Sequence, residues 1–202
     1  MEKKLKRETN ENVSFNGGNS AVVLIEFQKQ WTNKGLYNWL IKGQLRSRNV
    51  MENSISFVKG AREKGVKIIH APLIIDPKNK KGWLAYLTFG KVFTKGKEKS
   101  EITKGVFESE DTIVSGRYAF DAFIGSDLER LLVDNRIENV FFCGFTSDQC
   151  IAKSMRTALK KGFNAIFVSD CTATMSGIFQ KKTEKSFDGR VFLHKKILDM
   201  IK

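Results

Sequence analysis

The chain contains 202 residues, of which 41% are hydrophobic, and it carries a net charge of +13. This length can bury one sizeable core but is short for two independent domains, and no apolar run approaches the roughly 20 residues that span a membrane. Lysine and arginine are scattered among acidic residues without interleaved aromatic side chains, which argues against a nucleic-acid partner. Because the basic N-terminal stretch also lacks the apolar segment of a signal peptide, we expect a cytoplasmic protein with no membrane partner.

Short apolar runs alternate along the chain with segments of helical period, which is typical of βαβ units around a mainly parallel sheet. The polar residues 1–19 are predicted to form a flexible N-terminal tail, and residues 20–202 a single domain. Strands are predicted at residues 21–27, 66–72, 111–116, 139–145 and 164–170.

Between these strands, helices are predicted at residues 46–65, 126–137, 148–161 and 188–201. The second of these helices begins with Ser126 and Glu129 in capping-box register. The stretch from Ile75 to Phe107 follows neither period. We interpret it as a long excursion with a short helix, and as a candidate pocket wall or lid.

Three reactive side chains follow predicted strands. Glu26 closes the first apolar run, Arg117 follows the third, and Cys150 follows the fourth at the start of a predicted helix. In an open parallel sheet, ligands bind outside the carboxyl ends of the strands, so we expect these three side chains to lie at one edge. Together they supply a base, a cation and a nucleophile.

Each of these residue types also has an ordinary structural role. A single acid or arginine at a loop is usually a surface charge, and most cytosolic cysteines are small apolar fillers. We assign the filler role to Cys143 and Cys171, because three cysteines without metal-ligand spacing favour free thiols. Cys150 differs because the start of a helix stabilises a thiolate, so we expect its pKa to lie below the usual value of about 8.5.

Three blocks of the sequence share the order and spacing of a known superfamily. They are "AVVLIEFQKQW", "GRYAFDAFIGSDLERLL" and "VFFCGFTSDQCIAKSMRTALKKGFNAIFVSDCTATMS", and they span residues 21–176. The blocks resemble those of the isochorismatase-like cysteine hydrolases, which include nicotinamidases, N-carbamoylsarcosine amidase and ureidoacrylate amidase. The third block, with the cysteine-bearing turn, is the most specific of the three.

The resemblance implies a three-layer α/β/α sandwich with a mainly parallel sheet of about six strands, and a homo-oligomer, either a dimer or a tetramer. It assigns Cys150 as nucleophile, Glu26 to the acid/base position and Arg117 to the basic position. It also implies a cis peptide bond between Phe145 and Thr146. The amides of Thr146 and Cys150 would then form an oxyanion hole.

The chain departs from the family pattern at both charged positions. Glu26 stands where the family typically has Asp, and Arg117 stands where it has Lys. Arginine keeps its charge at physiological pH, so it can stabilise an anion but cannot relay a proton. The metal ligands of nicotinamidases are an Asp and two nearby histidines, and the corresponding region offers only His70 and Asp76. We therefore expect no metal site of that type and no organic cofactor.

The leading hypothesis is hydrolysis of a C–N bond in a small amide, carbamoyl or ureido compound through a covalent thioester intermediate. Phe27, Trp31 and Phe120 are candidates for the substrate pocket. One alternative is a catalytically silent family member that binds a small metabolite or a protein partner. Others are an isochorismatase-type ether hydrolase, which needs no covalent attack, and a redox sensor built on Cys150, which lacks an obvious resolving thiol.

Overall fold

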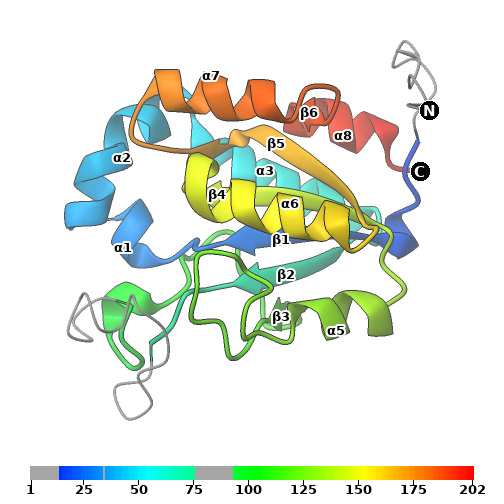
Figure 1. Cartoon of the computed structure of the whole chain (residues 1–202), viewed down its shortest axis with the longest axis horizontal. Coiled ribbons are helices and arrows are strands. Elements are labelled where there is room, and N and C mark those ends of the chain that lie inside the picture. The colour runs from blue at the N-terminus through cyan, green and yellow to red at the C-terminus, as the bar shows by residue number, and fades with distance from the viewer. Residues whose placement is uncertain (1–13, 34, 76–92) are drawn as a thin grey trace.

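The structure is a computed structural model that describes residues 14–33, 35–75 and 93–202, and a parallel sheet forms its centre (Figure 1). The sheet has six strands in the order β3-β2-β1-β4-β5-β6, and every neighbouring pair is parallel. The strands are β1 (Ser20–Ile25), β2 (Lys67–Ala71), β3 (Thr112–Ile113), β4 (Asn139–Phe145), β5 (Asn164–Ala173) and β6 (Val191–Phe192). The predicted α/β fold with a parallel sheet of about six strands is confirmed.

Helices pack on both faces of this sheet (Figure 1). The α-helices are α1 (Lys29–Thr32), α2 (Leu36–Ser47), α3 (Val50–Glu63), α5 (Leu128–Asp134), α6 (Ala152–Lys160), α7 (Gly177–Ser186) and α8 (His194–Met200). The shorter turns are the 3₁₀ helices η1 (Gly17–Asn19) and η2 (Glu98–Ser100) and the π-helical turn η3 (Ser147–Ile151). One apolar cluster joins the sheet to α2, α3 and α8, and a second joins its other face to α5 and α6.

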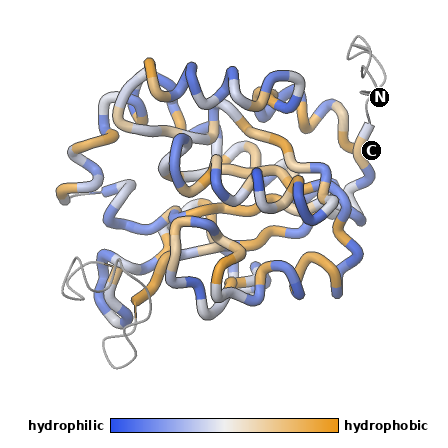
Figure 2. The backbone as a smooth tube through the Cα atoms, in the orientation of Figure 1, coloured by the Kyte–Doolittle hydropathy of each residue, from blue (hydrophilic) through white to orange (hydrophobic). Residues whose placement is uncertain are grey.

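Strand β1 shows why the sheet is covered on both faces. Its side chains alternate between the two apolar clusters: Val22 and Leu24 belong to the first, and Ala21, Val23 and Ile25 belong to the second. All of them are fully buried, and the central strands form an apolar band through the molecule (Figure 2). A strand that is buried on both faces has no polar side, which explains the uninterrupted apolar run in the sequence.

The C-terminal region differs from its prediction. The single helix predicted at 188–201 is instead strand β6 followed by α8, because Val191 and Phe192 pair with β5. Helix α7 was not predicted at all. It begins at Ser176, whose Oγ accepts a hydrogen bond from the Phe179 N–H at 3.3 Å. A two-residue strand is too short to show any periodicity in the sequence. Only its pairing with β5 in the fold reveals β6.

The helix predicted at 46–65 corresponds to the end of α2 and the whole of α3. The two helices are separated at Asn49, whose φ of 49° is left-handed and interrupts the helical path. The capping box predicted at Ser126 is also wrong. The Ser126 hydroxyl donates to the Ala122 carbonyl, and Glu129 forms an ion pair with Lys161 at 2.7 Å instead.

The N-terminal boundary of the fold lies before residue 20. Phe15 is 3% exposed, forms a bridge with Ile201 and packs edge-on against Phe141 at 5.1 Å. Residues 14–19 are thus packed against the C-terminal end of the chain. Residues 1–13 of the predicted tail lie outside the described residues.

The excursion predicted between Ile75 and Phe107 is described only at its two ends. Ile75 forms a bridge with Thr94, and η2 follows shortly after. Residues 76–92, the greater part of the predicted wall or lid, lie outside the described residues. Among the described helices, none combines the length and the apolar character needed to cross a bilayer.

Candidate active site

Glu26 lies at the carboxyl end of β1, below the molecular surface. Its φ of 58° is left-handed, an uncommon conformation for a non-glycine residue, and it turns the chain out of the strand. The side chain is 1% exposed. A carboxylate buried to this degree requires charged or hydrogen-bonding partners.

Arg117 is the main partner of this carboxylate. Its Nη2 donates to Glu26 Oε1 at 2.8 Å, and both side chains are 1% exposed. The rest of the guanidinium donates to backbone carbonyls: Nη1 to Ala71 at 2.6 Å, Nε to Ala119 at 3.0 Å and Nη2 also to Phe120 at 2.8 Å. These contacts hold the cation rigidly beside the carboxylate.

Two aromatic residues complete the surroundings of Glu26. The second carboxylate oxygen, Oε2, accepts a hydrogen bond from Trp31 Nε1 at 3.0 Å. Tyr37 lies against Trp31, with ring centroids 4.8 Å apart. Burial and the nearby Glu26 charge both raise the pKa of Tyr37. The sequence analysis did not identify Tyr37 as a site residue, because it lies on a part of helix α2 that was not predicted.

Cys150 lies in the turn η3, directly after the end of β4. The peptide bond between Phe145 and Thr146 is cis, as the resemblance implies, and Thr146 leads into the turn. The Thr146 carbonyl accepts hydrogen bonds from the amides of Gln149 and Ile151, at 3.3 and 3.2 Å. Cys150 itself is 3% exposed, so its thiol lies inside the protein.

The pKa of Cys150 is shifted in the opposite direction from the one we expected. Burial raises it well above the ordinary value, and the charge of Glu26 and a hydrogen bond to Glu26 raise it further. The charge of Arg117 and a hydrogen bond to the Thr146 backbone lower it, but they do not compensate. Desolvation of the thiolate therefore outweighs the effect of the helix start, and Cys150 rests as a neutral thiol beside a carboxylate.

The structure thus brings Glu26, Arg117 and Cys150 together from three separate strand ends. Glu26 and Arg117 are joined by a hydrogen bond, and both of their charges shift the pKa of the Cys150 thiol, so the three side chains form one electrostatically coupled group.

The cysteine turn is anchored from behind by α7, a contact that the sequence analysis missed. Ser147 Oγ donates to Gln180 Oε1 at 2.6 Å, and both residues are fully buried. Gln180 Nε2 in turn donates to Thr172 Oγ1 at 3.1 Å. A glutamine buried in an otherwise polar helix gives no periodic signal, so only the fold reveals this anchor.

The three predicted pocket residues occupy different places. Trp31 donates a hydrogen bond to Glu26. Phe120 adjoins the site because its backbone carbonyl accepts a hydrogen bond from Arg117. Phe27 is 2% exposed and packs against Phe145 with ring centroids 4.8 Å apart, inside the apolar core. A cavity of about 690 Å³ adjoins Arg117. The described residues that line it include Pro72, Lys95, Ser115 and Tyr118.

His70, one of the two residues considered as metal ligands, belongs to a separate network. Its Nε2 lies 3.0 Å from Asp111 Oδ2, and Arg62 Nη2 donates to the same oxygen at 2.6 Å. Burial raises the pKa of Asp111, but hydrogen bonds from His70, Arg62 and the Glu108 amide lower it to about 2. Asp76, the other residue considered, lies outside the described residues.

Solved structures share this fold. A cysteine hydrolase from Pseudomonas syringae pv. phaseolicola superposes with a TM-score of 0.81 at 15% identity, covering 95% of this chain and 98% of that chain. N-carbamoylsarcosine amidase from Thermoplasma acidophilum superposes with a TM-score of 0.72 at 17% identity, covering 87% of this chain and 96% of that chain. These similarities concern the fold.

Sequence comparison identifies the family. An uncharacterised isochorismatase family protein of Bacillus subtilis, YrdC, is 24% identical over 153 residues, which is 76% of this chain and 73% of that protein. The model of the isochorismatase domain matches residues 20–189, a range that contains all three members of the buried group. The chain therefore belongs to the isochorismatase family of hydrolases.

Proposed function

We propose that the protein is a cysteine-dependent hydrolase that cleaves a C–N bond in a small amide, carbamoyl or ureido compound. The observation that carries this proposal is the buried hydrogen bond between Glu26 and Arg117, next to a Cys150 thiol whose pKa responds to both of their charges. A nucleophile, a proton acceptor and a fixed cation are the groups that such a reaction requires.

In the proposed first half-reaction, Glu26 takes the proton from the Cys150 thiol as the sulfur attacks the substrate carbonyl carbon. The new C–S bond converts the carbonyl oxygen into an oxyanion. The amides of Thr146 and Cys150 would donate to this oxyanion, and the charge of Arg117 stabilises the negative charge of the site. The C–N bond then breaks, the nitrogen leaves with the proton held by Glu26, and a thioester remains on Cys150.

In the second half-reaction, Glu26 takes a proton from water, and the resulting hydroxide attacks the thioester. The C–S bond breaks, the acid is released, and the proton returns to sulfur. The neutral resting thiol fits this sequence, because the thiolate needs to form only when substrate is present. The nearby Glu26 carboxylate, whose charge acts on the Cys150 thiol, is the group proposed to receive the proton.

Arg117 takes an electrostatic role in this scheme. Its guanidinium donates to Glu26 and to three carbonyls, and arginine does not give up a proton at physiological pH. Glu26 is then the proton carrier in both half-reactions. The activity of the enzyme thus depends on one acid/base group and requires no organic cofactor.

A small substrate fits the burial of the site, since Glu26, Arg117 and Cys150 are each at most 3% exposed. The structural similarity to N-carbamoylsarcosine amidase supports a carbamoyl or amide compound as the first class to test. A homo-oligomer is also proposed, because large apolar side chains are exposed on α2 and α7, among them Trp39 at 62% and Ile178 at 78%. We place this oligomer in the cytoplasm.

One observation favours a second candidate, a silent relative that binds a metabolite or partner without turnover. The pKa of Cys150 is raised and both oxygens of Glu26 are hydrogen-bonded, so the resting site is not activated. In this case Arg117→Lys, which restores a group able to relay protons, would create turnover that the wild-type protein lacks.

A mass-spectrometric screen of small amides, carbamoyl compounds and ureas tests the proposal. Wild-type protein, Cys150→Ala and Cys150→Ser are compared, and a thermal melt confirms that each is folded. We expect turnover of at least one compound by the wild type alone. Turnover that survives in folded Cys150→Ala would exclude covalent catalysis by Cys150, and binding without turnover would favour the silent relative.

A further inference from the structure

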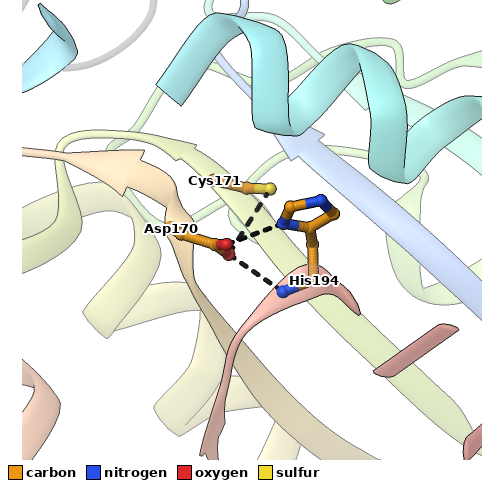
Figure 3. A group of neighbouring side chains, drawn as sticks. All are labelled: Asp170, Cys171 and His194. Carbon is orange, nitrogen blue, oxygen red and sulfur yellow. Dashed lines mark hydrogen bonds and ion pairs between the residues drawn. The ribbon is translucent and has the colours of Figure 1, made fainter. Parts of the chain in front are cut away.

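A second group of reactive side chains lies on the other face of the sheet from Cys150. Asp170 and Cys171 come from β5, and His194 is the first residue of α8 (Figure 3). One ligand atom from each lies within 4.8 Å of the others. Cys171 belongs to the apolar cluster under α3 and α8, whereas Cys150 belongs to the cluster under α5 and α6.

An irregularity in the sheet explains how two consecutive residues of one strand reach the same group. Side chains normally alternate between the faces of a strand. Between the pairs Phe142–Phe167 and Gly144–Thr172, two steps along β4 match five steps along β5. Such a bulge redirects side chains, and it lets the carboxylate of Asp170 meet the sulfur of Cys171. The thiol lies 3.9 Å from Asp170 Oδ1.

His194 is fixed on the opposite side of this carboxylate. Its Nδ1 lies 2.6 Å from Asp170 Oδ2, and its backbone N–H donates to Asp170 Oδ1 at 2.9 Å. The ring is buried, and Nε2 has no hydrogen-bond partner among the described residues. In a ring with a single proton, this hydrogen bond places the proton on Nδ1, directed at Asp170.

A second sulfur atom adjoins the group. Cys143 occupies β4 opposite the bulge and is fully buried in the same apolar cluster as Cys171. Burial raises the pKa of Cys143, and the neighbouring Cys171 raises it further. The Asp170–His194 pair can be explained by hydrogen bonding at the start of α8. The two neighbouring thiols are not needed for that hydrogen bonding, and they add sulfur atoms that can act as metal ligands.

We propose that Asp170, Cys171 and His194 form a binding site for a thiophilic divalent cation of the zinc type, with the neighbouring Cys143 of the same apolar cluster as the fourth donor. Two sulfurs, one imidazole nitrogen and one carboxylate oxygen are a four-donor set that suits tetrahedral zinc. The ion replaces the protons of both thiols, which leave to solvent, and His194 ligates through Nδ1 as the neutral tautomer that carries its proton on Nε2.

The burial pattern suits a structural ion rather than a catalytic one. Cys143 and Cys171 are 0% exposed and the His194 side chain is 3% exposed, so the donors are enclosed. The Asp170 side chain, at 18% exposed, reaches the surface and marks the side from which an ion enters. A bound ion would join β4, β5 and α8 and so stabilise the C-terminal part of the fold.

The test uses Cys150→Ala as the starting protein, because its only remaining thiols are the two proposed ligands. The protein is reduced with a phosphine, stripped with chelator and titrated with Co²⁺, which reports thiolate ligation by a charge-transfer band. We expect the band to saturate at one equivalent of cobalt and to disappear when Zn²⁺ is added. Zinc should also raise the melting temperature of the protein. Elemental analysis should then find stoichiometric zinc after gel filtration.

A second variant pair locates the site. In the Cys150→Ala background, Cys171→Ala should remove the band, whereas Ser109→Ala, at an exposed position, should leave it unchanged. Absence of the band and of stoichiometric zinc in Cys150→Ala overturns the proposal without any further variant. A band that persists in folded Cys150→Ala/Cys171→Ala also overturns it.

Discussion

Glu26 and Arg117 are separated by 91 residues in the sequence, yet Nη2 of Arg117 and Oε1 of Glu26 are joined by a buried hydrogen bond of 2.8 Å. This pair links the carboxyl end of β1 to the segment after β3, across β2. The pair also holds the Arg117 guanidinium close enough to Cys150 for its charge to lower the pKa of that thiol. Its removal should therefore affect both folding and reactivity.

The first prediction concerns the stability of this pair. Arg117→Gln removes the cation that pairs with the buried Glu26 carboxylate and leaves its hydrogen bond from Trp31, and we expect a loss of about 3–5 kcal/mol in the free energy of unfolding. Denaturant unfolding measures the loss. The double variant Glu26→Gln/Arg117→Gln should be more stable than the sum of the single losses predicts. Additive losses would contradict an energetic coupling between the two residues.

The second prediction concerns the reactivity of Cys150. The Glu26 charge raises the pKa of Cys150 and the Arg117 charge lowers it, so Glu26→Gln should increase the thiolate fraction at a fixed alkaline pH and Arg117→Gln should decrease it. Alkylation by iodoacetamide across a pH series, followed at the Cys150 peptide, measures both. Glu26→Gln should at the same time abolish turnover. Shifts of the same sign in both variants would contradict the electrostatic account.

The third prediction concerns the anchor of the cysteine turn. Gln180→Leu leaves Ser147 without its buried partner, which we expect to cost about 1–3 kcal/mol and to lower kcat more than it changes KM. Gln180→Glu keeps an acceptor and should recover part of kcat. Thr183→Ala on the same helix, whose hydroxyl only donates to the Phe179 carbonyl, is the matched control. Equal effects of Gln180→Leu and Thr183→Ala on kcat would show that the anchor does not position the turn.

The fourth prediction concerns acid stability. The pKa of Asp111 is about 2 in the fold, below its ordinary value of 3.8, so its ionised carboxylate stabilises the protein above about pH 3.8. This contribution is lost as the pH falls through about 2. Asp111→Asn should therefore be less stable than the wild type at neutral pH, and the difference should shrink below pH 3.8.

Unfolding titrations across this pH range measure that difference. Asp134→Asn provides the control, because Asp134 is exposed and its ion pair with Arg130, at 3.3 Å, lies at the surface. We expect the control to differ from the wild type by no more than about 0.5 kcal/mol at any pH. A pH-independent effect of Asp111→Asn would contradict the assignment.

The sequence predicted the sheet and the convergence of the site because both follow from local patterns. The apolar run of β4 was predicted with its observed bounds, Asn139–Phe145. The rule that strand ends gather at one edge was enough to bring Glu26, Arg117 and Cys150 together. Most of helix α2, helix α7 and strand β6 escaped prediction, because their packing depends on distant residues.

The ionisation of Cys150 was mispredicted for a related reason. The expectation of a low pKa rested on the start of a helix and on a nearby cation, both of which the sequence indicates. Burial, and the position of Glu26 relative to the thiol, depend on the whole fold and dominate the result. In the same way, the two remaining cysteines were taken for unrelated fillers, although the bulge in β5 brings Cys171 beside Asp170 and His194.

The most direct test of the central claim is intact-mass spectrometry of the wild-type protein, acid-quenched during turnover of a substrate found in the screen. We predict an acyl adduct that maps to Cys150 and never forms in Cys150→Ala. In Glu26→Gln, the adduct should accumulate only if the thioester forms but is not hydrolysed. Full turnover by folded Cys150→Ala, with no adduct on the wild type at any quench time, would contradict the account.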